Sequence, residues 1–201
     1  MTKVKVCGLR REEDIAFANE LMPDYIGFVF AKASRRYVLP ERAAELRRVL
    51  SRKIPAVGVF VDEPVEHILA LLEGGVIDAA QLHGGESAAD VRALKRRTGR
   101  TVIQAFRVET PEDIARAVES PADYILLDNG AGGTGEMFDW SLIADVPRPF
   151  FLAGGLSAEN VGEAIVRCSP YAVDSSSKLE TDGTKDYSKM KAFIDAVRGN
   201  G

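Results

Sequence analysis

The sequence predicts an α/β protein, a single-domain (β/α)8 TIM barrel over residues 1–201, and two observations carry this prediction. First, short β-branched or apolar runs alternate with amphipathic helical segments along the whole chain, which is typical of a parallel sheet. Second, the pattern repeats eight times within 201 residues, at the lower end of the size range of this barrel. A closed barrel fits so many units in a short chain better than an open doubly wound sheet.

Each unit begins with a short run in which apolar residues either alternate with other residues or follow one another without interruption. Strands are expected at Lys3–Cys7, Tyr25–Phe30, Ala56–Val61, Ala79–His83, Thr101–Arg107, Tyr124–Asp128, Phe150–Ala153 and Tyr171–Asp174. The helices that follow them are expected at Glu12–Leu21, Pro40–Leu50, Pro64–Leu72, Glu86–Arg97, Pro111–Val118, near Trp140–Ala144, at Ser157–Arg167 and at Tyr187–Val197. Pro40 suits a first helical turn, where its missing N–H would have no intrahelical partner.

The first strand has two very different faces. Lys3, Lys5 and Cys7 share one face because side chains alternate along a strand, and the other face holds two valines. A polar face fits either a solvated edge strand or an interior that holds polar groups for chemistry. A closed barrel has no free edge, so we expect Lys5 and Cys7 to point into the barrel, with Gly8 ending the strand.

Composition excludes several classes of protein. Apolar residues make up 46% and charged residues 28%, as in ordinary globular proteins, and the net charge of -4 does not favour nucleic acid or anionic membranes as partners. We find neither a run long enough for a transmembrane helix nor the apolar region of a signal peptide. Cys7 and Cys168 are the only cysteines, so we expect reduced thiols and a cytoplasmic protein, with Cys168 a small buried hydrophobe.

Two loops at the strand ends predict a phosphate site. Active sites of this barrel lie at the C-terminal ends of the strands, and phosphate binds after strands seven and eight. A Gly-Gly turn precedes a helix after the seventh strand, with Ser157 as the expected N-cap, and a serine cluster follows the eighth. The expected phosphate ligands are Gly154, Gly155, Asp174, Ser176 and Ser177.

Cys7 and Asp128 end the first and sixth strands. Alone, Cys7 could be a buried structural thiol and Asp128 a turn residue before Asn129. At one barrel mouth with a phosphate site, they fit a general base and a general acid better. We expect the charge of Lys5 to lower the pKa of the Cys7 thiol, and burial beneath the loop 129–135 to raise the pKa of Asp128.

His83 and Arg36 are two further candidates at strand ends. His83 is either a substrate ligand or a histidine that caps the core, and no second histidine or second strand-end carboxylate is spaced to form a metal site with it. Arg36 follows Arg35 after the second strand. Two arginines at an active-site mouth suggest that one holds an anion such as a substrate carboxylate.

Short motifs along nearly the whole chain occur in an order and spacing specific to one family. They are Lys5–Gly8, Gly27–Phe30, Ser34–Tyr37, Val57–Phe60, Gln81–Gly84, Leu126–Asp128, Gly132–Gly135, Phe138–Trp140, Ala153–Leu156 and Ala172–Asp174. By these motifs the sequence resembles the phosphoribosylanthranilate isomerase family of tryptophan biosynthesis. The family's usual glycine after the two matching serines is Lys178 here, which affects the detail of the phosphate site and not the reaction.

The resemblance implies an Amadori rearrangement in the cytoplasm. The residue matching Asp128 would protonate the furanose oxygen, the residue matching Cys7 would take a proton from C2, and Arg36 would hold the anthranilate carboxylate. Other expected substrate ligands are Lys5, His83, Gly133 and Gly135. The resemblance implies no cofactor and no metal, because the substrate nitrogen serves as the electron sink. It implies a small phosphorylated substrate, with no nucleic acid, membrane or obligate protein partner.

Two alternatives belong to other classes. One is another phosphosugar isomerase or epimerase barrel, but such chemistries typically use carboxylate pairs or a metal, so Cys7 counts against it. The other is a non-catalytic barrel that only binds a phosphorylated ligand. Loss of Cys7 or Asp128 would favour that interpretation, and the sequence has both.

Overall fold

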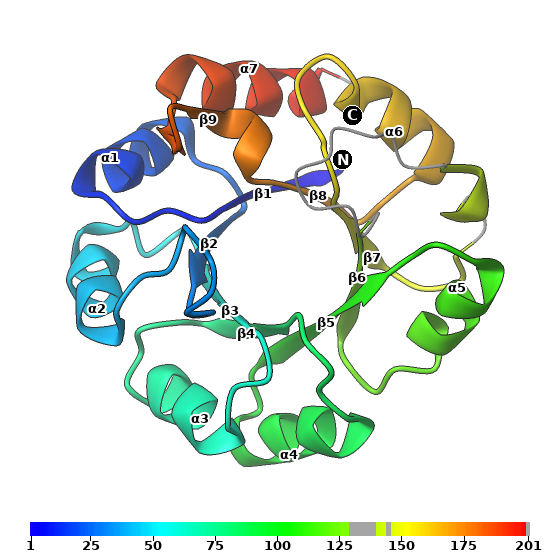
Figure 1. Cartoon of the computed structure of the whole chain (residues 1–201). Coiled ribbons are helices and arrows are strands. Elements are labelled where there is room, and N and C mark those ends of the chain that lie inside the picture. The colour runs from blue at the N-terminus through cyan, green and yellow to red at the C-terminus, as the bar shows by residue number, and fades with distance from the viewer. Residues whose placement is uncertain (129–139, 144–145, 200–201) are drawn as a thin grey trace.

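Eight parallel strands form a closed barrel in the computed structural model, which describes residues 1–128, 140–143 and 146–199 (Figure 1). The strands are β1 (Lys3–Cys7), β2 (Tyr25–Val29), β3 (Ala56–Phe60), β4 (Ala79–Leu82), β5 (Thr101–Arg107), β6 (Tyr124–Asp128), β7 (Phe150–Leu152) and β8 (Ala172–Ser175). They pair in chain order, and β1 closes the barrel against β8. The predicted barrel is therefore confirmed, with every strand end within one residue of its expected place.

Helices surround the barrel (Figure 1). They are α1 (Glu12–Leu21), α2 (Pro40–Val49), α3 (Val65–Glu73), α4 (Ala88–Thr98), α5 (Pro111–Val118), α6 (Val161–Cys168) and α7 (Tyr187–Arg198). The short helix expected after β6 is a 3-10 helix, η1 (Trp140–Ile143), and Ala144 lies outside the described residues. A second 3-10 helix, η2 (Ser177–Leu179), and a small hairpin, β9 (Glu180–Thr181) with β10 (Thr184–Lys185), lie between β8 and α7. No helix among the described residues is long and apolar enough to cross a membrane.

The helix after β7, which is α6, begins later than the sequence indicates. The expectation that Ser157 caps it is wrong, because α6 begins at Val161 and Asn160 takes the N-cap position. The Asn160 side chain accepts a hydrogen bond from the Ser157 N–H at 2.8 Å and donates one to the Gly155 carbonyl at 3.2 Å. These bonds fold residues 157–160 into a turn, so the helix terminus lies farther from the Gly-Gly turn than predicted.

The two faces of the strands line two separate hydrophobic cores, one beneath the helices and one inside the barrel. Val4 and Val6 of β1 pack outward in the core beneath the helices, while Lys5 and Cys7 point into the barrel. The barrel interior contains mainly small and aliphatic side chains from the other strands. We call the N-terminal ends of the strands the bottom of the barrel and their C-terminal ends the top.

Aromatic rings and aspartates organise the bottom. The ring centroids of Tyr124 and Tyr171 stack 4.6 Å apart, and the Tyr171 hydroxyl lies 3.0 Å from that of Tyr25. Three aspartates directly precede β2, β4 and β6. Each accepts a backbone N–H from the preceding strand at 2.9 Å: Asp24 from Val4, Asp78 from Ala56 and Asp123 from Val102. Because each aspartate also pairs with a Lys or Arg, these carboxylates are well satisfied.

Candidate active site

Lys5 lies inside the barrel with no exposed surface. Its Nζ donates to Asp174 Oδ2 at 2.6 Å, and the two residues are register partners on β1 and β8. Burial lowers the pKa of Lys5, but the interactions with Asp174 and Cys7 together outweigh burial and hold that pKa above its ordinary value of 10.5. The polar face of the first strand therefore points into the barrel, as predicted. Burial also raises the pKa of Asp174, and Lys5 acts against that shift.

This ion pair changes the interpretation of Asp174. A carboxylate repels a phosphate dianion, and this one is buried against a lysine within the barrel. That Asp174 contributes to a phosphate site stays a prediction, and in the structure its carboxylate is the partner of Lys5. Its second oxygen, Oδ1, is buried without a hydrogen-bond partner among the described residues.

Cys7 lies directly above Lys5 at the top of β1, and it is almost completely buried. Gly27 on β2 leaves room for the thiol, since a Cβ at that position would lie 2.6 Å from Cys7 Sγ. Burial raises the pKa of the thiol above its ordinary value of 9.0, although Lys5 and Lys185 both act to lower it. The prediction that Lys5 lowers this pKa has the right sign for that one interaction, but the net shift is upward because desolvation is stronger.

Asp128 ends β6 and faces His83, which directly follows β4. His83 Nε2 lies 3.6 Å from Asp128 Oδ2, and His83 Nδ1 lies 3.0 Å from the Gln81 amide nitrogen. An amide nitrogen can only donate, so with the Gln81 amide in this orientation His83 Nδ1 accepts and Nε2 carries the ring N–H. That N–H is on the side of Asp128. Asp128 Oδ1 is buried and without a hydrogen-bond partner in the described part of the chain.

The loop expected to cover Asp128 is not among the described residues. Gly133 and Gly135, the two expected substrate ligands in it, fall there as well. Their roles stay predictions. The described residues at the mouth are those at the C-terminal ends of the eight strands.

The loops after β7 and β8 lie against each other. Ser175 Oγ donates to the Leu156 carbonyl at 2.6 Å, which joins the two loops. Gly154 and Gly155 have φ of 94° and 69°, in the left-handed region where side chains are strained. Ser176 Oγ donates to the Cys7 carbonyl at 2.9 Å, so the second loop also contacts the end of β1.

Four of the five expected phosphate ligands therefore belong to these two joined loops: Gly154, Gly155, Ser176 and Ser177. Lys178, where the family has a glycine, lies within η2 and is not among the described residues with positive φ. The lysine thus fits this backbone without strain.

Arg36 crosses over Gly8 at the top of the barrel. A Cβ on Gly8 would lie 2.5 Å from Arg36 Cδ, and Gly8 has a φ of 84°, so only glycine suits this position. The guanidinium binds Glu180 through two hydrogen bonds, from Nε to Oε1 at 2.6 Å and from Nη2 to Oε2 at 2.8 Å. Lys185 Nζ binds the same Oε1 at 2.8 Å.

Glu180 and Lys185 are not among the residues predicted from sequence. A local signal exists in Asp182-Gly183, a dipeptide common in two-residue hairpin turns. Both residues have positive φ, 52° and 75°, as such a turn requires. The hairpin places Lys185 opposite Glu180 in register.

Comparisons with known proteins identify the family. The family model described as N-(5'phosphoribosyl)anthranilate (PRA) isomerase matches residues 4–196. This chain belongs to that family. The N-(5'-phosphoribosyl)anthranilate isomerase of Thermoanaerobacter sp. (strain X514) is 46% identical over 99% of both chains.

Solved structures agree with this family assignment. The crystal structure of phosphoribosyl anthranilate isomerase from Thermotoga maritima has a TM-score of 0.92 and 40% identity, covering 99% of this chain and 100% of that one. A crystal structure of a phosphoribosyl anthranilate isomerase in complex with reduced 1-(o-carboxyphenylamino)-1-deoxyribulose 5-phosphate has a TM-score of 0.89 and 39% identity, with the same coverage. The 3-hexulose-6-phosphate synthase from Salmonella typhimurium is only 13% identical at a TM-score of 0.76, so it shows the fold alone.

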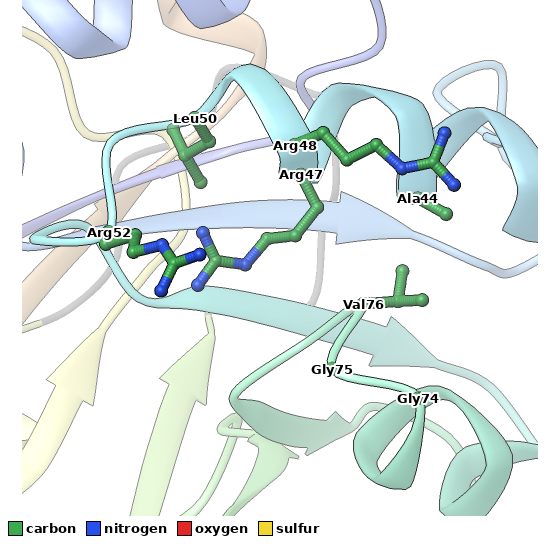
Figure 2. Close-up of a pocket in the computed structure, with 8 residues that line it drawn as sticks. All are labelled: Ala44, Arg47, Arg48, Leu50, Arg52, Gly74, Gly75 and Val76. Atoms are coloured by element: carbon green, nitrogen blue, oxygen red, sulfur yellow. The ribbon is translucent and has the colours of Figure 1, made fainter.

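A hollow of about 570 Å³ at the bottom of the barrel contains none of the residues expected for a phosphoribosylanthranilate isomerase site (Figure 2). Arg47, Arg48 and Arg52 line it beside Gly74 and Gly75. Arg47 pairs with Asp78, and both Arg47 and Arg48 lie in the last turn of α2, where cations complement the helix dipole. Arg47 and Arg48 are therefore explained by the structure. Within the described residues, no three His, Cys, Asp or Glu side chains gather closely enough to hold a metal ion.

Proposed function

We propose that this chain catalyses the Amadori rearrangement of N-(5'-phosphoribosyl)anthranilate to 1-(2-carboxyphenylamino)-1-deoxyribulose 5-phosphate, in tryptophan biosynthesis. One observation supports it most: a thiol and a carboxyl group, Cys7 and Asp128, end two strands of the same barrel in a chain of this family. The proposal includes one domain over residues 1–201 and a cytoplasmic location.

The proposed chemistry needs one acid and one base. Asp128 donates a proton to the furanose ring oxygen, and the C1–O bond breaks as the substrate nitrogen forms a Schiff base with C1. The Cys7 thiolate then removes the proton from C2, which gives an enolamine that tautomerises to the ketone. One proton is given and one is taken, so the isomerisation balances without a cofactor. The N–H of His83 Nε2 lies on the side of Asp128, where it would bind the substrate oxygens.

The two ends of the substrate carry charge, and two groups of residues would hold them. The joined loops after β7 and β8 would bind the phosphate through Gly154, Gly155, Ser176 and Ser177. Arg36 would bind the anthranilate carboxylate, which a guanidinium does well because its N–H groups match the two oxygens. Lys5 acts below these groups as the cation nearest the thiol.

A fluorescence assay that follows the loss of phosphoribosylanthranilate tests the proposal. The purified chain should consume it and form the ribulose product without an added cofactor. If the chain leaves this compound unchanged while it isomerises or epimerises another sugar phosphate, the alternative barrel enzyme is correct. If it binds sugar phosphates but turns none over, the barrel is a binding protein.

A further inference from the structure

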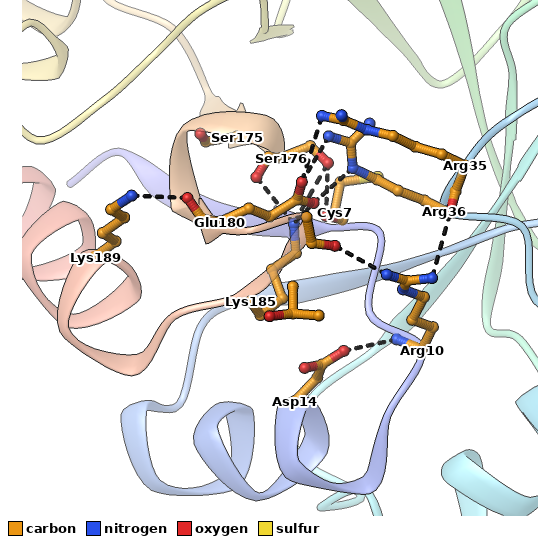
Figure 3. A network of polar contacts seen from close by, with 12 residues as sticks. Cys7, Arg10, Asp14, Arg35, Arg36, Ser175, Ser176, Glu180, Lys185 and Lys189 are labelled. Carbon is orange, nitrogen blue, oxygen red and sulfur yellow. Dashed lines mark hydrogen bonds and ion pairs between the residues drawn. The ribbon is translucent and has the colours of Figure 1, made fainter.

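Three charged side chains, Arg36, Glu180 and Lys185, form a cluster at the top of the barrel, which we call the Glu180 cluster (Figure 3). Lys185 is only 3% exposed and Glu180 only 9%. Lys185 Nζ also donates to the Ser176 carbonyl at 2.9 Å, and Ser176 in turn binds the Cys7 carbonyl. The cluster therefore joins the β2–α2 loop to the loop after β8 and to the end of β1.

The way Glu180 binds Arg36 leaves a defined part of the guanidinium free. A guanidinium has five N–H groups, and Glu180 takes the Nε proton and one Nη2 proton. Both Nη1 protons and the second Nη2 proton have no partner among the residues that the structure describes. The Nη1–Nη2 edge is the second planar fork of an arginine, and it suits one more carboxylate.

The charges in the cluster favour an anionic ligand. Glu180 alone would neutralise Arg36, but Lys185 shares the same carboxylate, so two cations face one anion. Burial raises the pKa of Glu180, yet hydrogen bonds from Arg36 and Lys185 outweigh it and hold that pKa at about 2. Glu180 thus stays ionised at neutral pH. Burial lowers the pKa of Lys185, and its pairing with Glu180 acts against that shift. With both cations protonated, one net positive charge remains. Arg35 Nη2 adds a more distant and exposed cation, 3.6 Å from Glu180 Oε2.

We propose that Glu180 and Lys185 are positioning residues that fix the Arg36 guanidinium so that its free Nη1–Nη2 edge receives the carboxylate of the substrate. Glu180 sets the orientation of Arg36. Lys185 holds Glu180 in place and keeps the cluster positively charged. This inference deepens the proposed function and rests on it, because it takes the carboxylate of phosphoribosylanthranilate as the ligand of Arg36.

Two ligands that differ only in this carboxylate test the inference. One is reduced 1-(o-carboxyphenylamino)-1-deoxyribulose 5-phosphate, and the other is its phenylamino counterpart without the carboxyl group. Calorimetry would give the Kd of each for the unmodified chain, Glu180→Gln, Lys185→Met and a control, Lys189→Met. Lys189 Nζ binds the backbone carbonyl of Glu180 at 2.7 Å and not its carboxylate, so the control changes the same surroundings and leaves the cluster whole.

We expect Glu180→Gln and Lys185→Met to weaken binding of the carboxylated ligand by about tenfold or more, the usual range for a charge-assisted hydrogen bond. The ligand without the carboxyl group should keep its Kd within about twofold. In steady-state assays KM should rise much more than kcat falls, because Arg36 binds a part of the substrate that does not react. Lys189→Met should behave like the unmodified chain with both ligands.

A double-mutant cycle separates positioning from a structural effect. In an Arg36→Met background, Glu180→Gln should cause no further loss of affinity for the carboxylated ligand, since the group it positions is gone. Equal losses for both ligands, an unchanged Kd, or full additivity with Arg36→Met would each overturn the inference. If Glu180→Gln does not fold, Lys185→Met in the same cycle makes the test, because it removes a bond to the Glu180 carboxylate and leaves Arg36 in place. Failure of the proposed function would appear separately, as an unmodified chain that binds neither ligand.

Discussion

The strand β6 carries an aspartate at each end, and the two have opposite surroundings. Asp123, just before the strand, uses both carboxylate oxygens: Oδ2 accepts the Val102 N–H at 2.9 Å, and Oδ1 lies 2.7 Å from Lys95 Nζ. Asp128, the last residue, has one buried oxygen without a partner in the described chain and another 3.6 Å from His83. Buried polar groups are normally hydrogen-bonded, so a buried carboxylate oxygen without a partner indicates that a ligand supplies the hydrogen-bond donor.

The same contrast extends around the barrel. At the bottom, Asp24 also uses both oxygens, for the Val4 N–H and for Lys3, and Asp78 binds the Ala56 N–H and Arg47 through Oδ2. Nearer the top, Asp174 Oδ1 and Gln81 Oε1 are also buried and unpartnered among the described residues. The comparison teaches that the carboxylates at the bottom are used by the fold, while Asp128 and Asp174 each keep an oxygen without a partner in the described chain, as the proposed substrate contacts require.

The largest effect is expected at the top. Cys7→Ser should lower kcat by at least about 10²-fold, the low end of the contribution of a general base, since a serine hydroxyl is far less acidic than a thiol. The far-UV spectrum and the urea midpoint should stay close to those of the unmodified chain. Near-normal turnover of phosphoribosylanthranilate by this variant would remove Cys7 from the mechanism.

A smaller effect, of another kind, is expected at the bottom. Asp24→Ala leaves the Val4 N–H without its partner and breaks the pair with Lys3, which should cost about 1–2 kcal/mol of unfolding free energy. Urea unfolding measures this loss. The kcat should be unchanged. A fall in kcat without a loss of stability would contradict the assignment of a purely stabilising role to Asp24.

The smallest effect concerns the pH dependence of the thiol. Burial raises the pKa of Cys7, and Lys5 opposes this more strongly than Asp174 adds to it, so Lys5→Met should raise that pKa further. The midpoint of Cys7 alkylation by iodoacetamide should move to higher pH. Lys3→Met is the matched control, because Lys3 lies on the same face of β1 but pairs with Asp24 at the bottom. A shift of the midpoint to lower pH would contradict the role of Lys5.

Patterns of local sequence predicted most of the fold. Alternation on β1 placed Lys5 and Cys7 on one face, and the repeated βα units indicated that this face points inward. Helix ends were less predictable where a side chain makes an alternative turn. Asn160, which bonds back to Ser157, delays the start of α6 in a way that a serine at an expected cap position does not reveal.

Site residues were predictable where a strand end marks them, and not where distant segments meet. Cys7, Asp128 and His83 follow from their places at or directly after strand ends. The Glu180 cluster depends on a contact across 144 residues, from Arg36 to Glu180, which no local pattern contains. The sign of the Cys7 pKa shift also required the structure, because the sequence shows a nearby lysine but not the extent of burial.

One paired measurement tests the contrast between the two ends most directly: kcat and unfolding free energy for Asp128→Asn and for Asp123→Asn, isosteric changes on one strand. We expect Asp128→Asn to lower kcat by at least about 10²-fold with unfolding free energy unchanged or slightly higher. Asp123→Asn should lower the unfolding free energy by about 1 kcal/mol and leave kcat within about twofold. If Asp123→Asn lowers kcat as much as Asp128→Asn does, or if Asp128→Asn keeps its activity, the division between a stabilising bottom and a catalytic top is wrong.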